Sequence, residues 1–337
     1  MTACLYLESF GVNLPGGIFT AWKTQCDALR TVGVKVVTDP SEPHDILHLY
    51  LPFLRSRFLA GRYHRLGQPL ITHVHMTAED FKNSFRGSNL VAPLFKMWLK
   101  NYYRKGDVIL TPTEYTRKLV AKNYDLPIDK IIPISNGINF KDFSEDFKKR
   151  EEYRKRLGMR GVVVFSLGWV FPRKGIYTFI DVAEKFPKTQ FFWFGASAPK
   201  TLTHLPRPIN PAPNTKFAGR IDDARGAMNA GDIFFFPSYE ENQGIVVLEA
   251  AVNGKAILLR DIPVFEDWMI HGKNCLKAKT DEEFEKYLKE LIADEKLRER
   301  LGQAAQNMAK EHDLPRIGEK LKNIYDDVIK RKKEQLG

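Results

Sequence analysis

Two glutamates eight positions apart, Glu241 and Glu249, are the side chains best placed to do chemistry in this chain. They flank Gly244, which lies between an apolar run at 232–236 and a second one at 245–253. This pattern predicts a buried strand, a polar loop and a helix, and in an open α/β sheet such a loop lies where ligands bind. The free amides at the helix start favour an anion such as a diphosphate, whereas carboxylates suit sugar hydroxyls. We therefore expect a nucleotide sugar at this loop.

A pair of cations, Arg173 and Lys174, precedes another predicted helix. They follow a predicted strand at 162–167 and come just before Gly175, which opens the helix. Arginine can bind phosphate oxygens through two N–H groups, and lysine acts as a point charge. Two solvated cations would be the simpler interpretation, but the start of a helix disfavours positive charge. We therefore expect both side chains at the diphosphate.

Two features of the N-terminal third also lie at predicted strand ends. Gly16 and Gly17 follow the first predicted strand, where glycines let the backbone approach a ligand, although a plain turn is the commoner meaning of such a sequence. His75 ends a strand predicted at 69–75. Because side chains alternate between the two faces of a strand, His73 and His75 lie on the same face, and only His75 reaches the strand end. A buried, hydrogen-bonded structural histidine is the alternative for His75.

The sequence around the two glutamates resembles a family signature. Pro237 and Ser238, then E-x(7)-E over 241–249 and Ala250, are similar to the signature of the large retaining glycosyltransferase family that includes glycogen, sucrose and glycolipid synthases. Members usually have E-G-F-G where this chain has E-N-Q-G at 241–244, a form that looks like bacterial synthases that glycosylate diacylglycerol lipids. The resemblance implies an α/β GT-B fold, with two facing Rossmann-like domains and a cleft between them. It also implies retention at the anomeric carbon.

The resemblance implies a role for each candidate residue. Glu249 would hold ribose hydroxyls, Glu241 would hold sugar hydroxyls, and His75 would position the sugar or the acceptor. Glu241 and His75 are thus the catalytic candidates. The residues that it places at the donor are Gly16, Gly17, Arg173, Lys174, Arg220, Ile221, Asn242, Gln243, Gly244, Ile245 and Glu249. Trp169 is a departure, because the family usually has an arginine there as the first cation of the diphosphate clamp.

The length of 337 residues predicts two domains. We expect an N-terminal acceptor domain at 1–145, a nucleotide-sugar domain at 146–315, and a terminal helix at 316–337 that packs back on the first domain. Three scattered cysteines without metal-ligand spacing indicate a reducing cytosol. We expect no secretory signal, and the chain has no apolar run of about 18 residues that would predict a transmembrane helix.

Positive charge is concentrated at 51–105, which holds ten arginines and lysines against two acids. Aromatic and basic residues alternate there along two predicted helices, at 54–66 and 90–104, a pattern that suits a membrane interface. The predicted membrane contacts are Arg55, Arg57, Arg62, Lys96, Trp98, Lys100, Tyr102 and Arg104. An amphipathic helix packed on its own sheet, with a solvated basic face, is almost as good an explanation. The predicted partner is an anionic membrane surface.

Together with these patterns, the resemblance implies an enzyme that moves glucose or galactose from a UDP-sugar to diacylglycerol or monoglycosyl-diacylglycerol. We expect no metal, because no D-x-D motif lies where one would be needed, and no other cofactor. We expect the protein in the cytoplasm, attached peripherally to the inner face of the membrane. One alternative is a glycosyltransferase with a soluble or cell-wall saccharide acceptor. A more distant one is a nucleic-acid-binding protein, for which no recognisable module is present.

Overall fold

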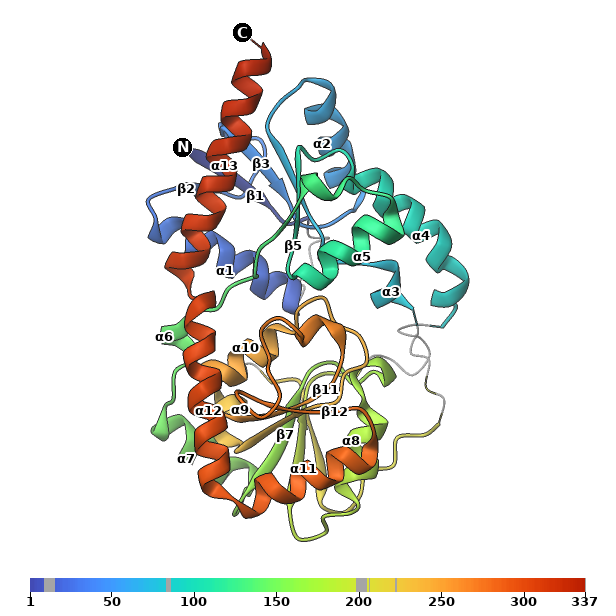
Figure 1. Ribbon diagram of the computed structural model, residues 1–337, viewed down its shortest axis with the longest axis vertical. Helices are drawn as coiled ribbons and strands as arrows, with labels where there is room; N and C mark the ends of the chain where they lie inside the picture. Colours follow the sequence, from blue (N-terminus) through green and yellow to red (C-terminus); the bar gives the residue numbers. More distant parts are fainter. Residues whose placement is uncertain (9–15, 83–85, 198–204, 206, 222, 337) are drawn as a thin grey trace. The chain divides into compact units, whose positions relative to one another are not determined.

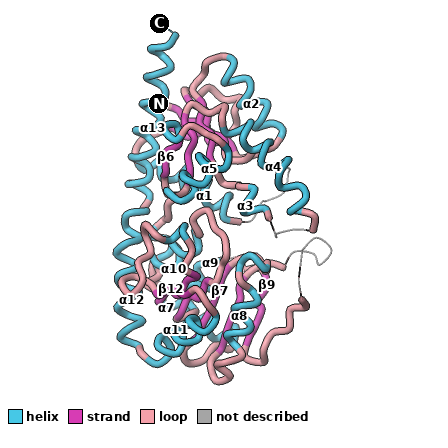
Figure 2. The backbone as a smooth tube through the Cα atoms, turned by 45° about the vertical axis from the view of Figure 1, so that its right-hand side comes forward, coloured by secondary structure: helices cyan, strands magenta, loops and turns pink. Residues whose placement is uncertain are grey.

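The chain folds into two α/β units. A computed structural model describes residues 1–8, 16–82, 86–197, 205, 207–221 and 223–336. The first unit comprises 1–81, 89–139 and 312–337, and the second comprises 82–88 and 140–311. In each unit a single layer of strands lies between helices (Figure 2). The predicted α/β class is confirmed.

The first unit is built on a six-stranded parallel sheet in the order β2-β1-β3-β4-β5-β6. Its strands are β1 (Thr2–Tyr6), β2 (Lys35–Val37), β3 (Ile46–Leu49), β4 (Leu70–His73), β5 (Val108–Thr111) and β6 (Ile131–Pro133). One face packs against α1 (Gly17–Thr31) and α13 (Leu314–Leu336). The other face packs against α2 (Leu54–Arg65), α4 (Ser88–Tyr103) and α5 (Glu114–Tyr124). The remaining short elements of this unit are α3 (Ala78–Phe81) and the 3-10 turn η1 (Ile128–Lys130), and the 3-10 turn η4 (Lys310–His312) spans the boundary with the second unit.

The C-terminal helix α13 lies beside α1 (Figure 1). A glycine makes this close packing possible, because a Cβ at Gly318 would come within 2.1 Å of the carbonyl oxygen of Ala28. Apolar side chains of α13, including Leu321 and Val328, then join the core against β1 and β3. The terminal helix is therefore an integral part of the first unit.

The second unit has its own six-stranded parallel sheet, in the order β12-β11-β10-β7-β8-β9. Its strands are β7 (Val163–Leu167), β8 (Gln190–Phe194), β9 (Thr215–Gly219), β10 (Ile233–Phe236), β11 (Ala256–Arg260) and β12 (Leu276–Ala278). Its helices are α6 (Phe140–Phe143), α7 (Phe147–Leu157), α8 (Ile176–Ala183), α9 (Ala224–Ala230), α10 (Ile245–Val252), α11 (Asp281–Ala293) and α12 (Glu295–Ala309). The 3-10 turns are η2 (Pro172–Lys174) and η3 (Pro263–Phe265).

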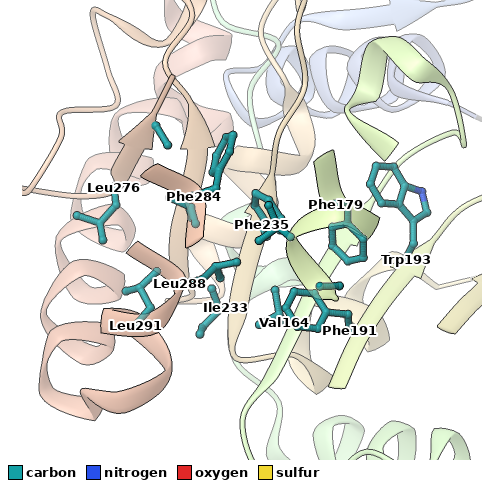
Figure 3. Packing of buried hydrophobic residues seen from close by; sticks show 14 of the residues in the cluster. Val164, Phe179, Phe191, Trp193, Ile233, Phe235, Leu276, Phe284, Leu288 and Leu291 are labelled. Carbon is teal, nitrogen blue, oxygen red and sulfur yellow. The ribbon is translucent and has the colours of Figure 1, made fainter. Parts of the chain in front are cut away.

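Aromatic packing fixes α8 against the second sheet (Figure 3). Phe179 of α8 stacks on Phe235 of β10, with 5.5 Å between ring centroids, and meets Trp193 of β8 edge-on at 5.1 Å. Such pairs contribute about 0.5–1.5 kcal/mol each beyond the burial of their area. Because α8 begins directly after Gly175, this core also fixes the polar turn that precedes it.

The unit boundaries differ by a few residues from those predicted. The chain passes from the first unit to the second at 139/140 and back at 311/312, whereas the sequence placed these points at 145/146 and 315/316. The first difference has a local cause: α6 packs against α9 and α10, and the carbonyl of Phe143 accepts a hydrogen bond from Asn253 Nδ2 at 2.8 Å. The strand β12 was not predicted, because it is only three residues long and has Lys277 at its centre.

Candidate active site

The second sheet reverses its strand order at β7 and β10, which lie side by side and run parallel. Successive strands after β7 extend to one side, and β10 to β12 extend to the other. In open α/β sheets, ligands bind outside the carboxyl ends of the strands at such a switch point. The polar segment 168–175 follows β7 and the segment 237–244 follows β10. The topology therefore brings the two predicted donor-binding segments to the same edge.

Hydrogen bonds and a close backbone contact join these two segments. The N–H of Tyr239 donates to the carbonyl of Arg173 at 2.8 Å, and the Arg173 guanidinium donates to the carbonyl of Glu240 at 2.7 Å. Gly175 has φ +79°, and a Cβ there would come within 2.2 Å of the carbonyl oxygen of Pro237. Only glycine fits this position, because it combines a left-handed backbone with contact to another chain segment.

Lys174 and Glu241 form an ion pair in this region. Lys174 Nζ donates to Glu241 Oε1 at 2.5 Å, and Ser238 Oγ donates to the same oxygen at 2.7 Å. Burial alone would raise the pKa of Glu241, but the charges of Lys174 and Arg173 outweigh it and hold that pKa below its ordinary value. Glu241 is therefore an ionised carboxylate. The sequence placed both residues at the donor but did not predict that they contact each other.

The helix α10 begins at Ile245, directly after Gly244, whose φ of +80° explains the glycine. Glu249 lies one turn into α10 and is only 5% exposed. Burial raises the pKa of Glu249 to about 7. Among the described residues, its Oε2 has no hydrogen-bond partner. A buried carboxylate oxygen without a partner is costly and suits a ligand that brings a hydroxyl donor.

The remaining predicted donor residues differ in burial. Gln243 is buried and Asn242 is half-buried in the turn before α10. Arg220 is exposed and Ile221 is half-buried, just after β9. Trp169 stacks on Phe171, with 5.8 Å between ring centroids, so an aromatic pair occupies the place where the family has a cation.

His75 belongs to the first unit, just after β4. It is 8% exposed, and its ring stacks on His73 at 4.0 Å and on Tyr50 at 5.2 Å. His73 is fully buried, as predicted, and its Nδ1 lies 3.1 Å from Nε2 of His48. Burial lowers the pKa of His75 to about 3, so the imidazole is neutral at physiological pH. A neutral ring can position a hydroxyl but carries no charge for the donor.

The predicted glycine loop of the first unit is described only in part. Gly16 and Gly17 are exposed at the N-terminus of α1, and Gly16 has φ +150°. The residues between β1 and Gly16 lie largely outside the described part of the chain. The role of these glycines at the donor therefore stays a prediction.

The predicted membrane contacts lie on α2 and α4, which pack side by side. The guanidinium of Arg57 lies 4.1 Å from the ring centroid of Trp98, and Trp98 Nε1 donates to the carbonyl of Pro52 at 2.7 Å. Lys100 pairs with Asp125 at 3.0 Å. Arg55, Arg62 and Arg104 are exposed, and Lys96 is half-buried.

The prediction for Tyr102 is wrong. Tyr102 is fully buried, because it lies on the same side of α4 as Leu99, which faces the sheet. The sequence also missed the exposed apolar side chains of these two helices. They are Leu54, Phe58, Leu90, Val91, Leu94 and Met97, which are between 48% and 85% exposed. Their helical spacing was visible, but which face the sheet would cover was not.

No metal site is evident, since the described residues contain no group of three or more histidines, cysteines or acids that could hold an ion. Within the same described residues, no helix is both long and apolar enough to cross a bilayer. The expectation that no metal is needed stays a prediction.

Comparison with known proteins relates this geometry to a family. A model described as glycosyl transferases group 1 matches residues 148–308, and one described as glycosyltransferase family 4 matches residues 40–142. The chain is 32% identical, over 99% of its length and all of the relative's, to the processive diacylglycerol alpha-glucosyltransferase of Acholeplasma laidlawii. The chain belongs to this glycosyltransferase family. The suspected resemblance is thus confirmed, and the protein is an enzyme of the hexosyltransferase type.

Two further proteins extend this comparison. The alpha-galactosylglucosyldiacylglycerol synthase of Streptococcus pneumoniae is 27% identical over 80% of this chain and 73% of its own. The crystal structure of HepE from Anabaena in complex with UDP-glucose superposes with a TM-score of 0.77, at 16% identity, and covers 97% of this chain and all of the other. That likeness concerns the fold, which is the GT-B fold predicted from the sequence.

Proposed function

We propose that this glycosyltransferase moves a glucose or galactose residue from a UDP-sugar to diacylglycerol or to monoglycosyl-diacylglycerol, with retention at the anomeric carbon. The observation that carries the proposal is the group at the switch point of the second sheet, where Lys174, Glu241 and Glu249 lie beside the start of α10. The names of the two related diacylglycerol enzymes support the lipid acceptor. The UDP-glucose bound to HepE supports the donor.

The proposed chemistry assigns charge stabilisation to the cations and amides. As the glycosidic bond to the diphosphate breaks, negative charge grows on the leaving group. Arg173, Lys174 and the first amides of α10 would stabilise that charge in a buried setting, where electrostatic interactions are strong. Lys174 is already held by Glu241, so it is oriented before the donor arrives.

The carboxylates of Glu249 and Glu241 would bind hydroxyl groups of the UDP-sugar. Glu249 Oε2 would accept hydrogen bonds from the ribose hydroxyls, which would satisfy an oxygen that lacks a partner among the described residues. Glu241 has one oxygen bound by Lys174 and Ser238, so its other oxygen would accept from the sugar. His75, neutral and held by ring stacking, would position the sugar or the acceptor.

We also propose that the enzyme works at an anionic membrane surface, which it meets through α2 and α4. The exposed apolar side chains cluster in the N-terminal halves of these helices, at Leu54, Phe58, Leu90, Val91 and Leu94, with Met97 a turn further on. Cations lie among them on α2, at Arg55 and Arg57, and continue toward the C-terminal ends, at Arg62, Arg65, Lys100 and Arg104. Apolar groups entering the acyl region, with cations at the headgroups, are typical of interfacial helices. This distribution favours a lipid acceptor over a soluble saccharide.

A product assay tests the function. Purified enzyme is incubated with UDP-glucose or UDP-galactose and with diacylglycerol, monoglucosyl-diacylglycerol or a soluble saccharide, the lipids in mixed micelles with anionic lipid. We expect a glycolipid from one donor and at least one lipid acceptor, with the α linkage of the donor retained. Transfer to the soluble saccharide alone would overturn the lipid assignment. Full activity in EDTA is expected if no metal is needed, and loss that added Mg²⁺ or Mn²⁺ restores would overturn that expectation.

A further inference from the structure

Arg260 is a buried cation that is held by hydrogen bonds and aromatic rings. It is the last residue of β11 and is 7% exposed. Among the described residues, its guanidinium makes no salt bridge. A buried charge is costly unless hydrogen bonds or ring contacts satisfy it, so the groups around Arg260 must do so. Two of those groups, on Pro237 and Tyr239, belong to the loop of the proposed donor site.

The guanidinium donates three hydrogen bonds and lies over two aromatic rings. Its Nε donates to the carbonyl of Pro237 at 3.0 Å, and its second nitrogen donates to Thr178 Oγ1 at 2.9 Å. The third donates to the carbonyl of Lys279 at 3.2 Å. Its central carbon also lies over the rings of Tyr239 and Phe284, 3.8 and 5.1 Å from their centroids, within the range of cation–π contacts.

Thr178 and Tyr239 complete a closed triangle. Thr178 Oγ1 and the Tyr239 hydroxyl are 3.2 Å apart, so Arg260, Thr178 and Tyr239 each contact the other two. The three residues come from β11, from α8 and from the loop after β10. The triangle therefore ties the helix that follows the two cations to the loop that carries the first glutamate.

The triangle acts on the donor site through the backbone. Pro237 and Tyr239 flank Ser238, whose hydroxyl donates to Glu241 Oε1 at 2.7 Å. The N–H of Tyr239 also donates to the carbonyl of Arg173 at 2.8 Å. Movement of Tyr239 would thus release both the carboxylate and the first cation from their present positions.

We propose that Arg260, with Tyr239 and Thr178, is a positioning residue for the UDP-sugar: it fixes the loop at 237–241 so that Arg173, Lys174 and Glu241 are oriented before the donor binds. This rests on the proposed function. Only arginine can donate in three directions and stack on a ring at the same time, so lysine would replace it poorly. Its positive charge, which Asp281 offsets only from a distance beyond that of a salt bridge, also adds to the attraction for an anion at this edge of the sheet.

The test compares UDP affinity in variants of the triangle. Arg260→Met removes the charge and the hydrogen bonds, Arg260→Lys keeps the charge, and Tyr239→Leu removes the ring from a residue that is half exposed. We expect UDP binding, measured by calorimetry, to weaken about tenfold in Arg260→Met and Tyr239→Leu, with a smaller loss in Arg260→Lys. KM for the donor should rise by a similar factor, whereas KM for the lipid acceptor should stay unchanged.

Arg154→Met is the matched control. Arg154 donates to the carbonyls of Ala230 and Gly161 and pairs with Asp232, at the opposite edge of the same sheet. We expect this variant to lose thermal stability without loss of UDP affinity. The inference is wrong if wild type binds UDP while Arg260→Met and Tyr239→Leu bind it within twofold, or if the Arg154 variant loses as much affinity as they do. If Arg260→Met does not fold, the UDP affinity of Tyr239→Leu alone tests the inference. A wild-type enzyme that binds no UDP overturns the proposed function, and this inference with it.

Discussion

The backbone of Gly175 lies against the carbonyl of Pro237, so closely that a Cβ at position 175 would be 2.2 Å from the carbonyl oxygen. Gly175 ends the turn that carries Arg173 and Lys174, and Pro237 begins the loop that carries Glu241. The two segments can therefore lie this close together only because residue 175 has no side chain. Any residue other than glycine must push the cations away from Glu241.

We predict that Gly175→Ala raises KM for the UDP-sugar about tenfold and also destabilises the protein. Alanine at φ +79° costs about 1–2 kcal/mol, and the contact with Pro237 adds to that cost by moving the loop. Gly158→Ala is the control, because Gly158 has φ +67° in the same unit but nothing lies within 4 Å of the position of its Cβ. Steady-state kinetics and thermal unfolding measure the two effects. Equal KM values in the two variants would contradict the role given to the contact.

Glu249 makes stability depend on pH in a direction that is unusual for an acid. Burial raises the pKa of Glu249 from its ordinary 4.5 to about 7. Below pH 4.5 the carboxyl group is protonated in both the folded and the unfolded state. Between pH 4.5 and pH 7 only the unfolded state loses the proton. Above pH 7 the folded state also loses it and then carries a buried charge. Its contribution to the free energy of unfolding therefore falls as pH rises through this window, by up to about 3 kcal/mol.

We predict that Glu249→Gln removes this dependence. Relative to wild type, the variant should gain up to about 3 kcal/mol of stability between pH 5 and pH 8. Urea unfolding at the two pH values measures the gain. Its UDP affinity should nevertheless fall at pH 8, where Glu249 of the wild type is ionised, since an amide oxygen is a weaker acceptor for ribose hydroxyls than a carboxylate. A stability difference that does not change with pH would show that Glu249 is already ionised in the free enzyme.

Local patterns in the sequence were enough to place the predicted donor segments at strand ends. The spacing of Glu241 and Glu249, and the two cations before Gly175, placed these residues at strand ends, and the sheet order brings those ends together. The triangle around Arg260 was not predictable in this way. It depends on the register of β11 against β10 and on the packing of α8, which join residues far apart in the chain.

The same limit explains the errors on the first unit. Helical spacing on α4 identified apolar and basic positions, but both of its faces carry apolar residues. The sequence therefore assigned Tyr102 to the membrane, whereas the sheet covers that face and leaves Leu94 and Met97 exposed. The short strand β12 escaped detection for a related reason, since its pairing with β11 is a tertiary contact and not a local preference.

Acid should destabilise the first unit through its buried histidines. Burial, with a contribution from the charge that His75 would carry, holds the pKa values of His48 and His73 well below 6.5. The folded state keeps these rings neutral while the unfolded state binds protons, so stability falls as pH drops below about 6.5. Each such ring contributes about 1.4 kcal/mol per pH unit within this window.

We predict that His48→Gln loses stability at pH 7 but less of it on acidification than wild type. Nδ1 of His48 lies 2.7 Å from the Tyr325 hydroxyl, and that lost hydrogen bond explains the cost at neutral pH. The slope of the free energy of unfolding between pH 6.5 and pH 5 should shrink by about one proton. His64→Gln is the control for the substitution itself, because His64 is exposed on α2 and lies outside the stacked histidine rings. Identical slopes for all three proteins would contradict the assignment.

Exposed apolar side chains of α4 provide the test of membrane attachment. Leu94 and Met97 are 67% and 66% exposed, so glutamate at either place should leave the core intact. Burying such a side chain in the acyl region stabilises the bound state by about 1.5–3 kcal/mol, and 1.4 kcal/mol is a tenfold change in affinity. We therefore predict that Leu94→Glu and Met97→Glu each weaken binding to anionic liposomes at least about tenfold in flotation.

Phe147→Glu supplies the comparison, because Phe147 is 71% exposed but lies on α7 of the second unit. It should bind liposomes as wild type does, and all three variants should bind UDP equally well. Glycolipid synthesis should fall in the α4 variants when the acceptor is in liposomes and recover when it is in detergent micelles, because only the first assay requires membrane docking. If Phe147→Glu floats as poorly as Leu94→Glu, the loss reflects added negative charge, and α4 is not the docking surface.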